Sequence, residues 1–486
     1  MSSPTADDTG AAADRPATAA GAAEDSSTAA GAAEDPSTAV DAAEPEARRD
    51  PVTTGLRAVL DHIRPNRDGA VADYVPQLAS ADPDPFGIAL VSMSGRKYAV
   101  GDCEQPFTIQ SISKAFVYAL AVSDHGMEAV LDRVGVEPSG EAFNAIKLEA
   151  GTGRPPNPMV NAGAMLTTSL VRAQYPEERL ERIIACLSAF AGRRLEVDQD
   201  VAQSELDTAS RNRALLYLMQ GAGSLREPVE EVLSVYCQQC AISVTATDLA
   251  VMAATLANGG VNPVTGVHVV DEEVTVRTQA VMATCGMYDY SGEWLLRVGL
   301  PAKSGVAGGL IAVGPASFGI GTFSPRLDDR GNSVRGISVA RTIADRFELH
   351  LMHHPGETAP VVYRQELLPP RAGRRGQTLV LGVQGVIEFG ATEQALAVLE
   401  AAIDASTGEQ PITGVIIDLH RVTQLRDLSN EMVRGRVKAL LADGVAVAIV
   451  RRQNGYAQVP DHRRVEAFRD FGEALAWIQA LPDVDA

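Results

Sequence analysis

A serine and two lysines stand at spacings that suit hydrolysis through a covalent intermediate. Ser111 and Lys114 are three residues apart at the start of an expected helix, and Lys303 follows much later, before Ser304-Gly305. Of the 42 lysines and arginines in the chain, five are lysines. A guanidinium keeps its proton, whereas an ammonium can lose one when burial or a neighbouring cation lowers its pKa. We therefore interpret Ser111 as a nucleophile and Lys114 as its general base.

The spacing alone is weak evidence, because about one or two Ser-x-x-Lys pairs occur by chance in a chain of this size. In the first turn of a helix, however, Ser111 and Lys114 share a face. The positive end of the helix favours a neutral amine and stabilises a developing oxyanion. Lys303 would be a supporting cation that lowers the pKa of Lys114 further, if its strand lies beside this helix. A surface helix start and an ordinary strand lysine are the alternative.

Longer motifs around these residues closely resemble the glutaminase family, within the larger pattern of the penicillin-recognising serine hydrolases. The motifs are Phe107-Thr-Ile-Gln-Ser-Ile-Ser-Lys114, Asn157-Pro-Met-Val-Asn-Ala-Gly-Ala164, Met287-Tyr-Asp-Tyr-Ser-Gly292 and Gly299-Leu-Pro-Ala-Lys-Ser-Gly-Val-Ala-Gly-Gly309. The resemblance covers nearly all of residues 55–350, and the motifs follow the family's order. It implies a β-lactamase-like fold that hydrolyses L-glutamine to L-glutamate and ammonia without a metal or an organic cofactor.

The resemblance also implies a set of site residues. Ser111 would be the nucleophile and Lys114 its base, while Tyr288 or Tyr236 would move a proton between them and the leaving ammonia. The residues expected to bind glutamine are Tyr74, Ser111, Asn161, Glu205, Asn212, Tyr236, Tyr288 and Val306, the last through its backbone N–H. Taken singly, Asn161 is equally well a helix cap, Glu205 a solvated side chain and the tyrosines core residues.

The charges of glutamine require the same residue types. Its ammonium needs a carboxylate such as Glu205, and its α-carboxylate needs amide donors such as Asn161 and Asn212. Glu205 and Asn212 are seven residues apart, so they would share a face on one helix. Backbone N–H groups of Ser111 and Val306 could form an oxyanion hole, in which one donor is worth about 3–4 kcal/mol. Acylation would leave a γ-glutamyl ester on Ser111, which water then cleaves.

Residues 53–355 are expected to form an α/β domain of the β-lactamase/transpeptidase type, an antiparallel sheet plus a helical subdomain. Strands at 86–91 and 97–100 flank Ser94-Gly95 as a β-hairpin. A mostly helical stretch runs to about residue 258, with a loop at 151–158, and strands return at 308–313 and 318–323. A strand-to-helix element is expected from about residue 336 to 350. Strands at both ends predict one sheet closed by distant parts of the chain.

A linker at 356–376 and a small α/β domain at 377–486 are expected to follow. The predicted strands are 378–383, 386–389, 414–419 and 445–450, and the predicted helices are 391–405, 429–441 and 465–481. Gly385–Phe389 and Gly414–Val422 resemble STAS domains, which are small regulatory modules. Those modules often carry a phosphorylatable serine after this second strand. Asp427 stands near that place here, and Ser429 is more simply a helix cap. The resemblance implies a regulatory or interaction role, with a protein partner bound through this domain, and no catalysis.

The first 52 residues are expected to be a disordered acidic tail. Residues 1–50 contain 11 acidic and 3 basic residues, which supply −8 of the net charge of −20.

The acidic balance argues against nucleic acid and anionic membranes as partners. No apolar run of about 18 residues and no export signal is evident. Five cysteines and no signal indicate reduced thiols in the cytoplasm, and Cys237 and Cys240 are expected to be structural.

Two other functions remain open from the sequence. One is a β-lactam-interacting serine peptidase on the same fold, which the missing Ser-Asp-Asn motif and missing export signal disfavour. The other is a glutamine-sensing signalling protein whose STAS domain is the output, which the full set of site residues disfavours. The family resemblance further implies a homo-oligomer, a dimer or a tetramer.

Overall fold

The computed structural model describes residues 50–73, 75–140, 145–353, 360–370, 376–406, 410–452 and 461–482. The acidic tail predicted at 1–52 therefore lies, up to residue 49, outside the described residues, and so does Tyr74. Contacts divide the chain into two compact units. The first contains residues up to 137, 141–279 and 303–339, and the second contains 138–140, 280–302 and 340 onward. We describe each unit by itself.

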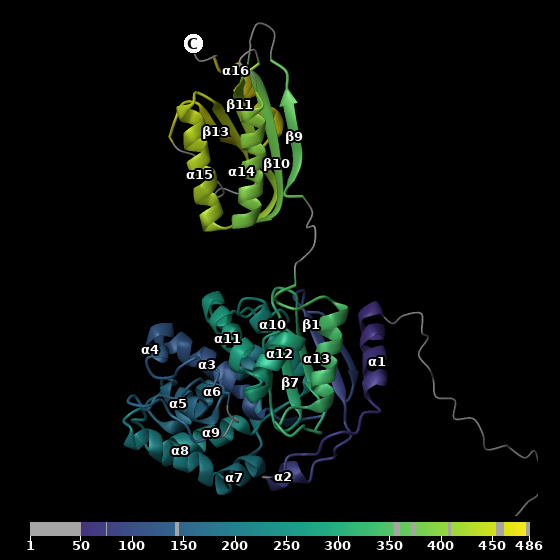
Figure 1. Ribbon diagram of the computed structural model, residues 1–486, viewed down its shortest axis with the longest axis vertical. Helices are drawn as coiled ribbons and strands as arrows, with labels where there is room; N and C mark the ends of the chain where they lie inside the picture. The colour runs from purple at the N-terminus through teal and green to yellow at the C-terminus, as the bar shows by residue number, and fades with distance from the viewer. Residues whose placement is uncertain are drawn as a thin grey trace, which may run out of the picture. The chain divides into compact units, whose positions relative to one another are not determined.

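The first unit is built on an antiparallel sheet whose strands come from both ends of the unit (Figure 1). The strand order is β2 (Lys97–Gly101), β1 (Gly87–Ser92), β8 (Phe318–Phe323), β7 (Gly309–Gly314) and β6 (Ala302–Ser304). Strand β1 pairs with β2 in the predicted hairpin and with β8 on its other side. The prediction of one sheet closed by distant segments is thus confirmed.

Helices fill most of the chain between β2 and β6, as predicted, and others precede β1 or follow β8. They are α1 (Pro51–Ile63), α2 (Pro76–Ala79), α3 (Ser113–His125), α4 (Met127–Leu131), α5 (Asn161–Leu170), α6 (Pro176–Ala191), α7 (Gln199–Asp207), α8 (Ser210–Gly221), α9 (Val229–Cys240), α10 (Ala246–Ala257), α11 (Glu272–Cys285), α12 (Ser291–Arg297) and α13 (Val334–Arg346). The strand-to-helix element expected at 336–350 is wrong in its first half, because α13 is helical from Val334 and no strand precedes it there.

Helix α10 packs closely on the sheet through small residues. A Cβ atom at Gly319 would clash with the backbone N of Ala254, and one at Gly321 would clash with the carbonyl oxygen of Ala246. A capping box closes the N-terminus of α10 by satisfying backbone N–H groups that have no partner in the helix. The backbone of α10 therefore lies directly against the backbone of strand β8, and glycine is needed at both strand positions.

A second, three-stranded sheet in this unit was not predicted. Its order is β3 (Phe107–Thr108), β5 (Ile242–Val244) and β4 (Glu196–Val197). Phe107 pairs with Val244, and the N–H of Ile109 donates to the carbonyl oxygen of Ile242 at 2.8 Å. These strands are only two or three residues long, too short for an alternating pattern to stand out in the sequence. They fix the chain immediately before Ser111.

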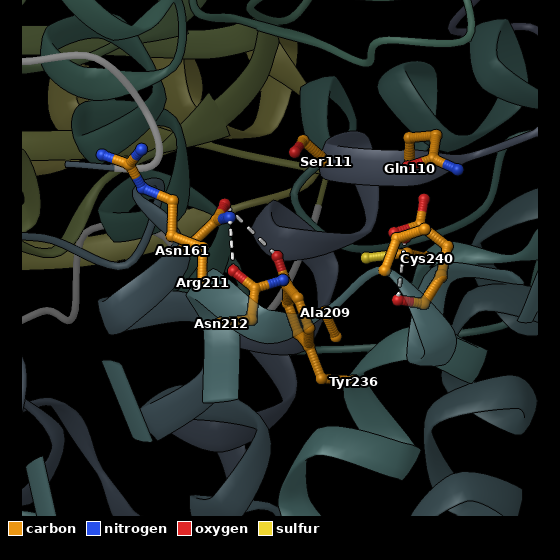
Figure 2. A pocket seen from close by; sticks show the side chains of 10 residues that line it. Gln110, Ser111, Asn161, Ala209, Arg211, Asn212, Tyr236 and Cys240 are labelled. Carbon is orange, nitrogen blue, oxygen red and sulfur yellow. Dashed lines mark hydrogen bonds between the residues drawn. The ribbon is translucent and has the colours of Figure 1, made fainter. Parts of the chain in front are cut away.

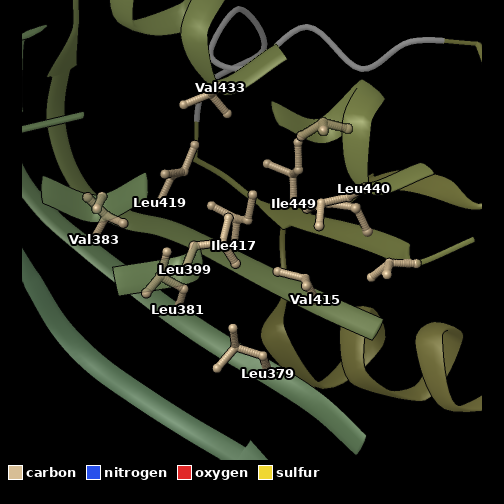
Figure 3. Close-up of a cluster of buried hydrophobic side chains, with 14 of the residues drawn as sticks. Leu379, Leu381, Val383, Leu399, Val415, Ile417, Leu419, Val433, Leu440 and Ile449 are labelled. Atoms are coloured by element: carbon tan, nitrogen blue, oxygen red, sulfur yellow. The ribbon is translucent and has the colours of Figure 1, made fainter. Parts of the chain in front are cut away.

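The second unit contains a mixed five-stranded sheet with helices on both faces. The strand order is β13 (Val465–Phe468), β12 (Ala446–Val450), β11 (Ile412–Leu425), β10 (Gln377–Ile387) and β9 (Val362–Leu368). All neighbouring pairs are parallel except β9 with β10, which is antiparallel. Alternate residues of β10 and β11 pack against α14 (Phe389–Asp404) and α15 (Asp427–Ala442), as Figure 3 shows.

Several boundaries predicted for this unit were wrong. The linker at 356–376 contains strand β9, and the two strands expected at 378–383 and 386–389 are one strand, β10. The helix expected at 465–481 is strand β13 followed by α16 (Phe471–Ala480). Ser429 is not a cap: it lies inside α15, fully buried, and its Oγ has no hydrogen-bond partner among the described residues.

In the part of the chain that the structure describes, no helix combines the length and the apolar character needed to cross a membrane.

Candidate active site

Ser111 lies on a short turn that joins strand β3 to helix α3. Gln110, Ser111 and Ile112 form one turn of 3-10 helix, and α3 continues from Ser113. Gln110 has φ of 51°, in the left-handed region that L-residues other than glycine rarely adopt. This conformation turns the chain sharply between strand and helix. Ser111 consequently faces a cavity and is 7% exposed.

The cavity has a volume of about 250 Å³, and most of the residues that line it have polar side chains (Figure 2). The residues that line it come from the Ser111 turn and from α5, α7, α8 and α9, with Thr208 and Ala209 between α7 and α8: Gln110, Ser111, Asn161, Glu205, Thr208, Ala209, Arg211, Asn212, Tyr236 and Cys240. Five of the residues expected from the sequence therefore meet around one space. They are Ser111, Asn161, Glu205, Asn212 and Tyr236.

Lys114 lies one turn after Ser111 on α3, and its side chain is buried. It is 1% exposed, and its Nζ donates to Asn161 Oδ1 at 2.7 Å and to the carbonyl oxygen of Met159 at 3.3 Å. Burial lowers the pKa of Lys114 to about 8, against the opposing effect of the Glu205 carboxylate. A substantial fraction of this amine is therefore neutral near pH 8.

Lys303 is also fully buried, on strand β6. Its Nζ donates to the carbonyl oxygen of Ser304 at 2.8 Å. Burial and, after it, the charge of Lys114 lower the pKa of Lys303 well below its ordinary value. The two lysines are close enough to repel each other. Burial, rather than Lys303, is the main cause of the shift at Lys114, which differs from the weight that the sequence interpretation gave to like charge.

Three amide and phenol groups connect the buried lysine to the cavity. Asn161, the first residue of α5, donates from Nδ2 to Asn212 Oδ1 at 2.9 Å. Its Oδ1 accepts from Lys114 and, at 3.4 Å, from the hydroxyl of Tyr236 on α9. Figure 2 shows two dashed lines from the Asn161 amide, one to Asn212 and one to Tyr236. Asn161 is therefore a shared partner of the lysine and of the cavity wall.

Glu205 and Asn212 reach the cavity from two helices, not from one helix as expected. Helix α7 ends at Asp207 and α8 begins at Ser210, so the chain breaks between them. Glu205 accepts a hydrogen bond from the Gln110 side chain, and burial raises the pKa of its carboxyl. Its Oε1 is buried and has no hydrogen-bond partner among the described residues. This oxygen is a ready acceptor for a cationic ligand group.

The other predicted site residues, Val306, Tyr288 and Tyr74, are not among the described residues that line the cavity. Val306 is buried and follows Gly305, where a Cβ atom would lie 2.9 Å from the carbonyl oxygen of Ile109. The 305–306 segment therefore passes beside the Ser111 turn. Tyr288 belongs to the second unit, is buried with φ of 57°, and is not among the residues that line the cavity. Tyr74 lies outside the described residues.

Known proteins resemble this chain in sequence. The family model for glutaminases matches residues 69–352, more than half of the chain. The chain belongs to the glutaminase family. The glutaminase of Microcystis aeruginosa is 56% identical over 285 residues, which are 59% of this chain and 84% of the relative. The glutaminase of Corynebacterium efficiens is 40% identical over 405 residues, which are 82% of this chain and 92% of the relative.

Solved structures match the fold as well. The native form of Mglu has a TM-score of 0.74 and 41% identity, and the match covers 82% of this chain and 99% of that chain. The probable glutaminase ybaS has a TM-score of 0.61 and 39% identity, with 62% of this chain and 98% of that chain covered. The longer match extends well beyond the residues that the family model covers, so Mglu has a counterpart to much of the second unit.

Sequence reasoning missed several residues that line the cavity of this glutaminase: Gln110, Thr208, Ala209, Arg211 and Cys240. Gln110 and Arg211 adjoin predicted residues, but nothing in their own type indicated a role. Cys240 was interpreted as structural, and its buried thiol has a pKa that burial raises to about 12, so it is neutral. Among the described residues, no cluster of His, Cys, Asp and Glu side chains could hold a metal ion.

Proposed function

We propose that this glutaminase hydrolyses the side-chain amide of L-glutamine through a γ-glutamyl ester on Ser111, with Lys114 as the general base. The observation that carries the proposal is the state of Lys114. Its amine is buried one helical turn from a cavity-facing serine, and its pKa is lowered to about 8. A lysine whose pKa lies near working pH is matched to general-base catalysis.

In the first step, Ser111 Oγ gives its proton to the neutral amine of Lys114 and attacks the amide carbon of glutamine. The carbonyl oxygen becomes an oxyanion, which the backbone N–H groups of Ser111 and Val306 stabilise. The C–N bond breaks as the leaving nitrogen takes up a proton from Lys114, directly or through the hydroxyl of Tyr236 or Tyr288. Ammonia leaves, and the γ-glutamyl group remains as an ester on Ser111.

In the second step, the same groups act on water. Lys114, neutral again after protonating the leaving group, takes a proton from a water molecule that attacks the ester carbonyl. The oxyanion forms at the same two N–H donors, and the C–O bond to Ser111 breaks with return of a proton to Oγ. L-Glutamate leaves. In its protonated form Lys303 would support both steps, because a cation beside Lys114 disfavours the ammonium form of Lys114.

Glutamine is recognised by groups whose charges complement its own. The unpartnered Oε1 of Glu205 would accept from the substrate ammonium. Asn161 and Asn212 would bind the α-carboxylate through amide N–H groups, with Tyr236 beside them. Tyr74 is proposed from family resemblance alone. A cavity of about 250 Å³ with these groups on its walls suits one polar amino acid.

The test measures ammonia release from glutamine by the wild type, Ser111→Ala, Lys114→Arg and, as control, Lys97→Arg on the exposed strand β2. The arginine variant keeps the positive charge at 114 and removes the titratable amine. Ser111→Ala and Lys114→Arg are expected to lose roughly three orders of magnitude or more in kcat, and Lys97→Arg to remain at the wild-type rate. A wild-type rate in either site variant would disprove the mechanism.

We further propose that residues 377–486 form a STAS-like regulatory domain that has no part in the chemistry and binds a protein partner. The motifs at 385–389 and 414–422 support this proposal, as does the mixed sheet with parallel β10, β11 and β12. Assembly into a homo-oligomer and residence in the cytoplasm are proposed on the family resemblance and on cysteines that are all free thiols in the described residues.

A further inference from the structure

The carbonyl oxygen of Gln110 is the end of a buried chain of hydrogen bonds. Ser113 donates to it twice, from its backbone N–H and, at 2.8 Å, from its hydroxyl. Gln239 on α9 donates from Nε2 to Ser113 Oγ at 3.0 Å, and Thr168 on α5 donates to Gln239 Oε1 at 2.8 Å. Ser113, Gln239 and Thr168 are all 0% exposed. Side chains of three helices therefore converge on one peptide group.

The hydrogen bonds of this chain point one way, from Thr168 through Gln239 and Ser113 to the Gln110 carbonyl, and the Thr168 hydroxyl also lies 3.0 Å from the Ala164 carbonyl oxygen. The Ser113 hydroxyl has one hydrogen, and it is used on the Gln110 carbonyl, so Ser113 Oγ must accept from its other neighbours. Gln239 must then point its NH₂ group at Ser113 and its oxygen at Thr168. Each bond in the chain polarises the next, because all of them point the same way.

The Gln110 carbonyl and the Ser111 N–H belong to one planar peptide group. In a trans peptide the C=O and N–H bonds lie in that plane and point in opposite directions, so any donor that holds the carbonyl also sets the direction of the N–H. A carbonyl that accepts strong hydrogen bonds also makes the N–H of the same group a better donor. The peptide follows a residue in the left-handed conformation, which the surroundings must hold in place.

We propose that Thr168, Gln239 and Ser113 are positioning residues that aim and polarise the backbone N–H of Ser111 as an oxyanion-hole donor. This inference rests on the proposed function, in which that N–H stabilises the oxyanion. None of the three residues lines the cavity. Their effect is therefore confined to the transition state, because the amide oxygen of glutamine carries full negative charge only there.

The test compares Ser113→Ala with Ser169→Ala. Ser169 is a matched control, because its Oγ donates to the carbonyl three residues earlier at 2.8 Å and the residue is 3% exposed, yet it lies away from the Ser111 turn. Both variants lose the same kind of buried bond, so similar drops in Tm are expected. For Ser113→Ala we expect kcat on glutamine to fall roughly 10- to 100-fold, with KM and the Kd for L-glutamate within about twofold of wild type.

A second pair tests the far end of the chain and covers the case in which Ser113→Ala does not fold. Thr168→Val removes the first donor, and Thr167→Val removes a neighbouring buried hydroxyl that donates to Gly163 on the same helix. Thr168→Val should lower kcat about two- to fivefold with KM unchanged, and Thr167→Val should not. Equal kcat losses within each pair, or a KM that rises in step with the kcat loss, would overturn the inference while leaving glutaminase activity intact. A wild type that releases no ammonia would end both proposals.

Discussion

Lys114 and Glu205 change their pKa values in opposite directions for the same physical reason. Each is charged in water, and burial penalises the charged form of each, so the pKa of the amine falls and that of the carboxyl rises. Their attraction works against both shifts. The proposed mechanism requires a neutral Lys114 amine and an ionised Glu205 carboxylate, and a substrate ammonium beside Glu205 would stabilise that carboxylate. The site is thus prepared for catalysis by its ligand as well as by its fold.

The pH dependence follows from the state of Lys114. In the proposed mechanism Lys114 acts as base only when neutral, and its pKa is lowered to about 8, so kcat/KM should rise with pH and level off above an apparent pKa of about 8. Initial rates of ammonia release from pH 5 to 10 check this. A profile that is flat from pH 6 to 10, in enzyme that stays folded by circular dichroism, would show that another group is the base.

Removal of the Glu205 charge should change both binding and pH dependence. In Glu205→Gln the Lys114 ammonium loses a nearby anion, so its pKa should fall below that of the wild type and the rise in kcat/KM should move to lower pH. The substrate ammonium loses its partner as well, which raises KM by about 10- to 100-fold. Glu181→Gln, on an exposed position of α6, is the control. A rise that moves to higher pH would contradict the assigned geometry.

At this scale the sequence indicated residue types but not backbone conformation. Ser111, Lys114 and Asn161 could be chosen because the chemistry requires an alcohol, a titratable amine and an amide. Gln110 could not be chosen, since its role depends on a left-handed φ that the residue type does not indicate. The break between α7 and α8 was equally hidden, because no glycine or proline lies between Glu205 and Asn212.

At the scale of elements, the buried strands were predicted from the sequence and the unburied strand was missed. The hairpin at β1 and β2 has a strong turn signal, and β1, β7 and β8 are nearly continuous apolar runs. Strand β9 was missed because none of its residues is buried, so it has no alternating apolar pattern. Edge strands of this kind are held mainly by backbone hydrogen bonds to their neighbour. Their sequences therefore carry little information about their structure.

The contact between α10 and β8 gives a prediction about stability. Gly321→Ala would place a Cβ against the backbone of α10, so the helix must shift, and the free energy of unfolding should fall by about 1–3 kcal/mol. Gly55→Ala is the control, since no atom lies within 4 Å of its added Cβ in helix α1. There the free energy of unfolding should rise by up to about 1 kcal/mol. Urea unfolding of both variants measures this, and equal effects would refute the close packing.

At the scale of the whole molecule, the relatives differ in how much of this chain they match. The Microcystis aeruginosa glutaminase and the probable glutaminase ybaS match 59% and 62% of this chain, yet 84% and 98% of their own length. Glutaminase 2 of Bradyrhizobium diazoefficiens is 41% identical over 456 residues, or 89% of this chain. Proteins that carry the name glutaminase therefore exist with and without a counterpart to residues after about 353. The catalytic residues proposed above all precede that point.

A chain ending at His353 should therefore keep its activity. The cut is placed before β9, because β9 pairs with β10 and a later cut would leave an unpaired strand. The kcat of the 1–353 chain should lie within about fivefold of the full chain, since no proposed catalytic or substrate-binding residue is removed. Ammonia release and circular dichroism are measured together, with Ser111→Ala in the short chain as the blank. A short chain that is folded, binds L-glutamate and yet turns over no glutamine would show that the C-terminal residues take part in the chemistry.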